Sequence, residues 1–143
     1  MVNYEKIRHK LRAITTCLIK LDELKLFNED DFLRDYKLTD SARHNLQIAI
    51  EAMLDIANHL IARHSFELPK KNADSFVILC KHGVLSEEME ATYASMARFR
   101  NRIVHMYDEV DNREIYRILQ EHLLDYASFI RDIVRYMEKQ QLS

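Results

Sequence analysis

Glycine and proline are almost absent from this sequence, which contains one of each, Gly83 and Pro69, in 143 residues. Tight turns depend on these two residues, so a β-sandwich or β-barrel, which needs many such turns, is disfavoured. A glycine-rich phosphate-binding loop cannot be built from a single glycine either. The scarcity predicts an all-α fold in which a few long helices are joined by short polar connections.

Cysteine is also scarce, and long apolar runs are missing. The two cysteines, Cys17 and Cys80, lie inside apolar helical patterns, where free cysteine behaves as a small hydrophobic residue. No signal-peptide pattern precedes Tyr4, which indicates a reducing compartment rather than a disulfide. No apolar run approaches the ~18 residues that a membrane span requires. We therefore expect a soluble cytoplasmic protein without a membrane segment.

The chain has no large excess of one charge, because its formal net charge is −2. No global positive field recruits nucleic acid, so any binding of RNA must come from a local patch. The length suits one domain that buries its own core without metal or disulfide cross-links. We expect residues 1–143 to form a single domain.

Apolar spacing predicts five helices. The first begins at Tyr4 and ends near residues 27–30. The second region spans about 31–63, and its residues 39–41 are consistent either with a break or with one bent helix. This region is apolar over most of its circumference, so it is either central to a bundle or shared with another subunit.

Three more helices follow in the predicted five-helix, mostly up-and-down bundle. The third covers about 73–82, after Pro69 has ended the preceding region, and Gly83 is its left-handed C-terminal cap. The fourth begins at Ser86 and ends near residue 107. The last follows a cap pair formed by Asp111 and Glu114 and runs to about residue 139.

One polar stripe could be read as a metal site. Glu51, Asp55 and His59 follow one another at four-residue steps and share one face of the second helix. The di-iron signature of helical bundles places a histidine three residues after a glutamate, whereas Leu54 and Asn58 occupy those positions here. We therefore favour a polar stripe that is solvated or joins helices, with a metal site as the weaker alternative, and we expect no metal or other cofactor.

The most informative segment is basic. Arg98, Arg100 and Arg102 occur in a stretch, residues 96–106, that contains no acidic residue. Cations are ordinary in the C-terminal half of a helix, so arginines alone would indicate nothing more. Asn101, His105 and Tyr107 distinguish this segment from an ordinary basic helix end.

Arg100 and His105 have the chemistry that metal-free RNA cleavage requires. An arginine carries a permanent planar charge that matches phosphate oxygens. A histidine with an unperturbed pKa of ~6.5 can accept and return a proton near neutrality. When a 2′-hydroxyl attacks the adjacent phosphate, a histidine transfers the proton and an arginine stabilises the developing charge.

Helical geometry complicates this hypothesis. On an ideal helix Arg100 and His105 lie about 140° apart, His105 stacks over Asn101 and Arg102, and Tyr107 returns close to the direction of Arg100. Either the helix loosens before His105, or two copies of the chain assemble the site across a symmetric interface.

Arg100, Asn101, His105 and Tyr107 together resemble the R-x-x-x-x-H-x-Y motif of HEPN-domain proteins, specifically the HepT-like branch of toxin–antitoxin systems. The resemblance extends over most of the chain in the same order. Three further segments are similar to that family: Gln47 to His59, Pro69 to Val84, and Tyr116 to Leu119.

The resemblance implies a HEPN-like helical homodimer that acts as a metal-independent endoribonuclease with a composite cleft. It makes Arg100 and His105 catalytic and Asn101 and Arg102 supporting residues of a type VII toxin whose RNA product carries a 2′,3′-cyclic phosphate. Tyr107 matches the tyrosine that a cognate nucleotidyltransferase antitoxin modifies with AMP. The alternative is a non-catalytic helical adaptor or nucleotide-binding partner of a nucleotidyltransferase, in which Arg100 and His105 bind a nucleotide or hold a dimer.

Overall fold

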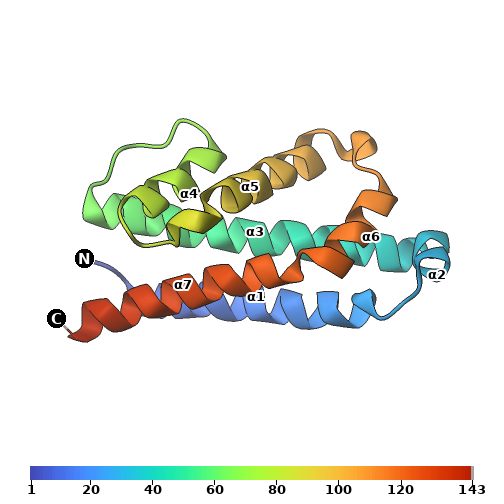
Figure 1. Cartoon of the computed structure of the whole chain (residues 1–143), viewed down its shortest axis with the longest axis horizontal. Coiled ribbons are helices and arrows are strands. Elements are labelled where there is room, and N and C mark those ends of the chain that lie inside the picture. Colours follow the sequence, from blue (N-terminus) through green and yellow to red (C-terminus); the bar gives the residue numbers. More distant parts are fainter. Residues whose placement is uncertain (143) are drawn as a thin grey trace.

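Helices dominate the computed structural model, which describes residues 1–142 (Figure 1). The all-α prediction is confirmed, but this part of the chain forms seven α-helices where five were predicted. The helices are α1 (Tyr4–Lys25), α2 (Glu29–Arg34), α3 (Tyr36–His64), α4 (Asn72–Lys81), α5 (Glu90–His105), α6 (Asn112–Glu121) and α7 (Leu123–Leu142). Two 3₁₀ turns, Glu87–Met89 and Tyr107–Glu109, flank α5.

Two breaks account for the additional helices. The first lies at Asp35, whose carboxylate accepts a hydrogen bond from the backbone N–H of Lys37 at 2.9 Å and so caps α3. Residues 39–41 lie inside α3, so the break expected there was wrong. The alternative of one bent helix over residues 31–63 was also wrong, because the chain leaves the helix at Asp35. The second break is at His122, which leaves the helical region (φ −126°, ψ 5°) between α6 and α7. No glycine or proline marks either position.

The helix ends follow local rules only in part. Gly83 has the predicted left-handed conformation, with φ +75°. The end of α3 at His64 agrees with the predicted end near residue 63, but it is Ser65, in a left-handed conformation (φ 54°), rather than Pro69 that stops the helix. The carboxylate of Asp111 caps α6, but Glu114 does not complete a capping box and binds Arg102 instead.

The central helix of the bundle is α3. In the view of Figure 1, α4 and α5 lie above it and α1 and α7 below it, while α2 and α6 lie at the far end from the termini. The largest apolar side chains of α3 are fully buried in one continuous core. These include Leu46, Ile50, Met53 and Leu60. The wide apolar surface of α3 is therefore covered within the chain, and the predicted central position is confirmed.

Both cysteines are free and buried, as predicted. Burial raises the pKa of the Cys80 thiol to about 12, so it stays protonated at neutral pH. Among the described residues, no helix is both long enough and apolar enough to cross a membrane.

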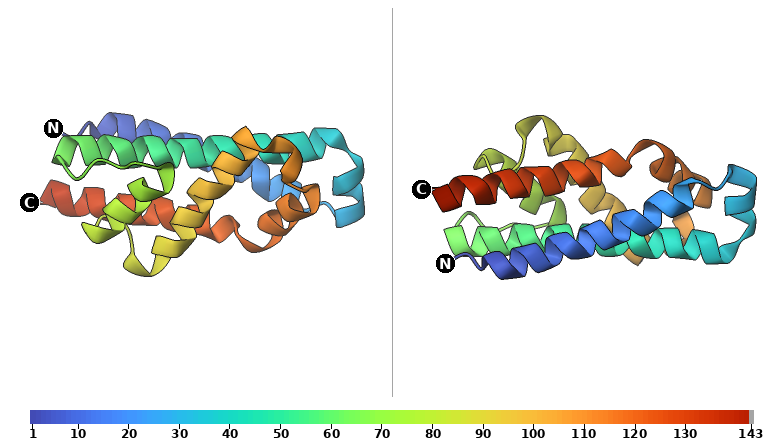
Figure 2. Two further views of the ribbon diagram at one scale, coloured as in Figure 1. Left: turned by 90° about the horizontal axis from the view of Figure 1, so that it is seen from above. Right: turned by 90° about the horizontal axis from the view of Figure 1, so that it is seen from below.

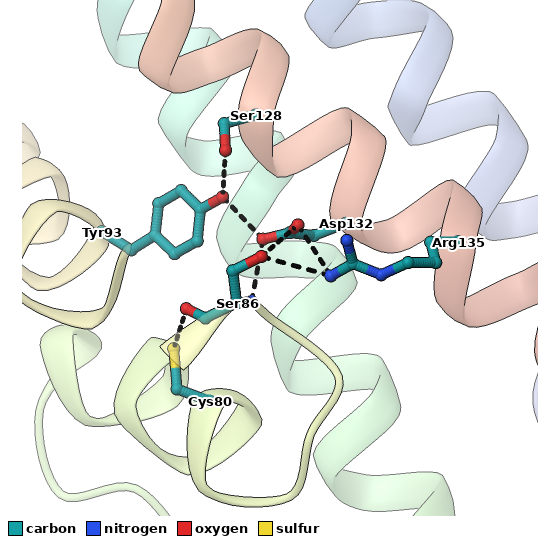
Figure 3. Close-up of polar contacts among 6 residues, drawn as sticks. All are labelled: Cys80, Ser86, Tyr93, Ser128, Asp132 and Arg135. Carbon is teal, nitrogen blue, oxygen red and sulfur yellow. Dashed lines mark hydrogen bonds and ion pairs between the residues drawn. The ribbon is translucent and has the colours of Figure 1, made fainter. Parts of the chain in front are cut away.

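A buried carboxylate fixes the start of α5 against α7 (Figure 3). Asp132 on α7 is 1% exposed, and its oxygens accept hydrogen bonds from the backbone N–H and hydroxyl of Ser86 at 2.9 and 2.6 Å. The Tyr93 hydroxyl on α5 donates to the same carboxylate at 2.8 Å, and Arg135 pairs with it at 3.0 Å. Ser86, predicted to begin the fourth helix, instead precedes the 3₁₀ turn Glu87–Met89 and joins the α4–α5 connection to α7, so α5 begins at Glu90.

Candidate active site

The last turn of α5 crosses α3 obliquely, which brings its basic residues close to three other helices (Figure 2). The helix is regular through His105, and the N–H of Met106 still donates to the carbonyl of Arg102 at 2.8 Å. The helix therefore does not loosen before His105, and that alternative was wrong. As the ideal helix predicts, consecutive side chains from Arg100 to Arg102 turn to different neighbours.

Arg100 is fixed against α3. Its Nε and Nη2 donate to one carboxylate oxygen of Glu51 at 3.0 and 2.9 Å, and its Nη1 donates to the Oδ1 of Asn101 at 3.2 Å. Gln47 donates to the same Glu51 oxygen at 3.0 Å. The guanidinium has five N–H donors, so two remain for a ligand once these three bonds are made.

Asn101 and His105 face the start of α4. The side-chain amide of Asn72 donates to the Oδ1 of Asn101 at 3.0 Å, which ties α4 to α5. Asn101 and His105 line a polar pocket of about 370 Å³ together with Lys70 and Lys71 from the α3–α4 loop. The imidazole of His105 is exposed and has no hydrogen-bond partner among residues 1–142. Both ring nitrogens are therefore open to a ligand.

Arg102 points away from this pocket. It forms a bidentate pair with Glu114 on α6, with distances of 2.8 and 2.9 Å, and this hydrogen bonding raises the pKa of the Arg102 guanidinium. Arg102 also lines a separate cavity of about 650 Å³ between α5, α6 and α7. The structure thus groups Asn101 with Arg100 and His105, but it does not bring Arg102 to them.

Tyr107 begins the 3₁₀ turn after α5 and is 51% exposed. Its hydroxyl donates to the Oδ1 of Asp40 on α3 at 3.4 Å, and the guanidinium carbon of Arg43 lies 4.6 Å from its ring centre. Arg43 is 7% exposed and donates to the backbone carbonyls of Tyr107 (3.3 Å) and Val110 and to Asn112 (2.9 Å). These bonds hold the turn that presents the tyrosine.

Asp40, Arg43 and Asn72 were not predicted from the sequence. A signal was present for the first of these, because Asp40, Gln47, Glu51 and Asn58 are polar residues of α3 at spacings of seven, four and seven. Such spacing places them on one side of α3. That side contacts the C-terminal end of α5 through Glu51 and the turn after it through Asp40.

The stripe considered as a metal site joins helices instead. Glu51 pairs with Arg100, Asp55 pairs with Lys10 on α1 at 2.8 Å, and the Nε2 of His59 accepts the backbone N–H of Asn3 at 3.0 Å. Within the described chain, no three His, Cys, Asp or Glu side chains are grouped so that they could hold a metal ion.

His59 is held in its neutral form by its surroundings. Burial lowers the pKa of its imidazole, and the nearby charges of Lys6, Arg63 and the N-terminus lower it further. A neutral imidazole can accept the hydrogen bond from Asn3, and a protonated one cannot.

The arrangement suits a phosphate ligand. The polar pocket combines an unpaired imidazole with two lysines, and the guanidinium of Arg100, fixed by Glu51, reaches the pocket residue Asn101. In such a setting arginine stabilises negative charge on phosphate oxygens, and histidine transfers protons near neutral pH.

Known proteins are similar to this chain in both sequence and fold. A family model described as "Ribonuclease HepT-like" matches residues 14–133. The mRNA nuclease HepT of Shewanella oneidensis is 30% identical over 129 residues, which are 90% of this chain and 96% of that protein. The tRNA nuclease HepT of Aphanizomenon flos-aquae is 28% identical over 120 residues, 82% of each protein.

A solved structure, that of the tri-AMPylated Shewanella oneidensis HEPN toxin in complex with MNT antitoxin, superposes with a TM-score of 0.83. Its sequence identity is 29%, and the match covers 91% of this chain and 97% of that one. The fold is therefore HEPN-like. Since the family model spans most of the sequence, the chain belongs to the HepT-like ribonuclease family.

Proposed function

We propose that this protein is a metal-independent endoribonuclease toxin of a type VII toxin–antitoxin system, and that Arg100 and His105 act on the RNA phosphate. The observation that carries the proposal is the end of α5, where an unpaired, exposed His105 follows a guanidinium fixed by Glu51 and Asn101. Relatives named as mRNA and tRNA nucleases that align along most of the chain support it.

In the proposed reaction the ribose 2′-hydroxyl attacks the adjacent phosphorus and the bond to the 5′-oxygen breaks. His105 takes the proton from the 2′-hydroxyl or supplies one to the leaving 5′-oxygen, and the products are a 2′,3′-cyclic phosphate and a 5′-hydroxyl. The two N–H donors of Arg100 that Glu51 and Asn101 leave open stabilise the negative charge on the phosphate oxygens.

The proposed active unit is a homodimer in which each copy of residues 1–143 is a single domain. Arg100 pairs with Glu51 on α3, whereas His105 lines the pocket at the start of α4, and Arg100 is not among the residues that line that pocket. Val104 and Met106, which flank His105, are exposed apolar side chains. They provide an apolar surface on which a second copy can bring its own His105 to Arg100.

Tyr107 is the proposed control point, and a cognate nucleotidyltransferase antitoxin is the proposed partner. The Tyr107 oxygen attacks the α-phosphorus of ATP, pyrophosphate leaves, and the phenolic proton is lost. The AMP group then adds bulk and negative charge beside His105, which repels a polyanionic substrate. The exposure of Tyr107 and the AMPylated toxin among the structural relatives support this assignment.

Expression of the chain without its antitoxin tests the proposed activity. Wild type is expected to slow growth, and the purified protein is expected to cleave RNA in the presence of a chelator, whereas His105→Ala is expected to do neither. The rival function is a non-catalytic adaptor or nucleotide-binding partner. Equal behaviour of wild type and His105→Ala in both assays would support the adaptor.

A further inference from the structure

The polar pocket at the start of α4 contains two lysines that have no part in the proposed reaction of Arg100 and His105. Lys70 and Lys71, at the end of the α3–α4 loop, form one wall, and Asn101 and His105 form another. None of the described residues that line it is acidic. By contrast, the larger cavity beside Arg102 includes Glu114 and Asp125 in its lining.

The loop that carries these lysines is fixed through its backbone. The N–H groups of Lys70 and Lys71 both donate to the Oδ2 of Asp74, at 3.1 and 3.0 Å. Earlier in the same loop, Glu67 binds Lys81 at 2.6 Å and His82 at 2.7 Å. The loop is thus tied to α4 at both ends without using either lysine side chain.

The ammonium groups of Lys70 and Lys71 have no hydrogen-bond or ion-pair partner in the described chain. Lys10 and Lys81, in contrast, are paired with carboxylates. Two unpaired lysines held side by side next to an exposed histidine give a local positive field in a protein whose net charge is negative. Such a field attracts polyanions.

Asn101 adds a neutral donor to the same wall. Its Oδ1 accepts hydrogen bonds from Arg100 and Asn72, which leaves its Nδ2 without a partner among residues 1–142. An amide donor beside two ammonium groups suits a phosphate oxygen or the edge of a base.

We propose that Lys70 and Lys71 form a phosphate-binding subsite that holds single-stranded RNA next to His105. This inference rests on the proposed ribonuclease function and assigns to it binding residues outside the α5 motif. The lysines contact two backbone phosphates that flank the bond to be cleaved, one each, so they set affinity and the register of the strand rather than the chemical step.

The expected effect follows from counterion release. Each phosphate contact with single-stranded RNA contributes roughly 0.7 to the slope of log affinity against log salt. At about 0.1 M salt this corresponds to roughly fivefold in affinity per contact, so loss of both lysines weakens binding by roughly 25-fold and flattens the slope by about 1.4.

The test measures binding of a fluorescein-labelled single-stranded RNA to the His105→Ala protein, which does not consume the probe. Lys70→Ala/Lys71→Ala in that background is compared with Lys70→Arg/Lys71→Arg, which keeps the charge. The matched control is Lys20→Ala/Lys25→Ala, which removes two exposed lysines from α1. The expected result is weaker binding with a flatter salt slope for the first variant alone.

Equal binding by the Lys70→Ala/Lys71→Ala and Lys20→Ala/Lys25→Ala proteins would overturn the subsite. The subsite is also overturned if RNA binding is unchanged and the first variant instead loses its complex with the nucleotidyltransferase, because the loop would then bind the antitoxin.

Cleavage is measured separately with His105 intact. The Lys70→Ala/Lys71→Ala enzyme is expected to have a raised KM for RNA and a nearly unchanged kcat. A wild-type protein that cleaves no RNA contradicts the proposed function, whereas the binding comparison still decides the subsite.

Discussion

At the scale of single residues, the surroundings of Tyr107 explain how it can be a control point. Arg43 is buried, and its guanidinium holds the backbone of the turn that carries Tyr107, while a carboxylate oxygen of Asp40 accepts a hydrogen bond from the Tyr107 hydroxyl. The other tyrosines near the C-terminal half are less available. Tyr93 is fully buried against Asp132, and the hydroxyl of Tyr116 donates to the carbonyl of Phe27 at 3.0 Å.

Tyr107→Phe is expected to abolish AMP transfer, because it removes the accepting oxygen and leaves the ring on Arg43. Intact-mass measurement after incubation with the nucleotidyltransferase and ATP should show no AMP-sized increase. Tyr36→Phe is the matched control, since Tyr36 is also exposed and lies on α3 near Asp40. Retained modification of the Tyr107→Phe protein would place the acceptor elsewhere.

His59 gives the fold a pH dependence of known sign. Burial and neighbouring positive charges lower the pKa of His59 below its ordinary value of 6.5. As the pH falls below about 6.5, His59 becomes protonated in the unfolded chain before it does so in the folded chain. The free energy of unfolding therefore decreases in that range.

His59→Gln is expected to reduce this pH dependence, because glutamine can accept the Asn3 hydrogen bond but does not titrate. The measurement is Tm between about pH 7.5 and about pH 5.5. Wild type should lose more Tm than the variant, and the other six histidines contribute equally to both proteins. Identical slopes would mean that folding does not lower the pKa of His59.

At the scale of helices, apolar periodicity was sufficient for most of the fold. It located the five main helical regions and the buried faces of α3 and α5, because burial imposes a 3.6-residue repeat. It failed at Asp35 and His122, where no glycine or proline is present and the break depends on how α2 and α6 pack. From the sequence, Asp35 and His122 could not be distinguished from other polar residues within a helix.

The motif in α5 was visible in the sequence, but its contacts with Glu51 and Asn72 were not. Arg100, Asn101 and His105 lie within six residues of one another, whereas Glu51 and Asn72 come from other helices. Only the tertiary packing of α3, α4 and α5 brings those two to the motif. The directions in which Arg100, Asn101 and His105 leave α5 were predicted from ideal helical geometry, because α5 is a regular helix through His105.

The clamp on α5, formed by Asp132 with Ser86, Tyr93 and Arg135, yields a prediction about stability. Asp132→Asn removes the charge that accepts hydrogen bonds from Ser86 and Tyr93 and pairs with Arg135, so the free energy of unfolding is expected to fall by about 3 kcal/mol. Urea denaturation measures this change. Asp125→Asn, which affects only a more exposed pair with His122, should change it by less than about 1 kcal/mol. Similar losses in both variants would show that the clamp contributes little.

At the scale of the whole molecule, one chain carries all the residues of the proposed reaction but directs them to different sides. Arg100 faces α3, and His105 faces the start of α4. A two-fold axis near the exposed Val104 and Met106 would place Arg100 of one copy opposite His105 of the other. The core of α3 is already covered within one chain, so the proposed interface is confined to the end of α5 and its surroundings.

RNA cleavage by a mixture of two inactive variants tests the shared site most directly. Arg100→Ala and His105→Ala are each expected to be inactive in the presence of a chelator. When they are mixed in equal amounts and allowed to exchange, half of the dimers contain one of each, and one of their two sites has both residues. We predict recovery of about one quarter of wild-type activity. A mixture as inactive as its components would contradict the shared site, and a His105→Ala protein as active as wild type would contradict the catalytic role itself.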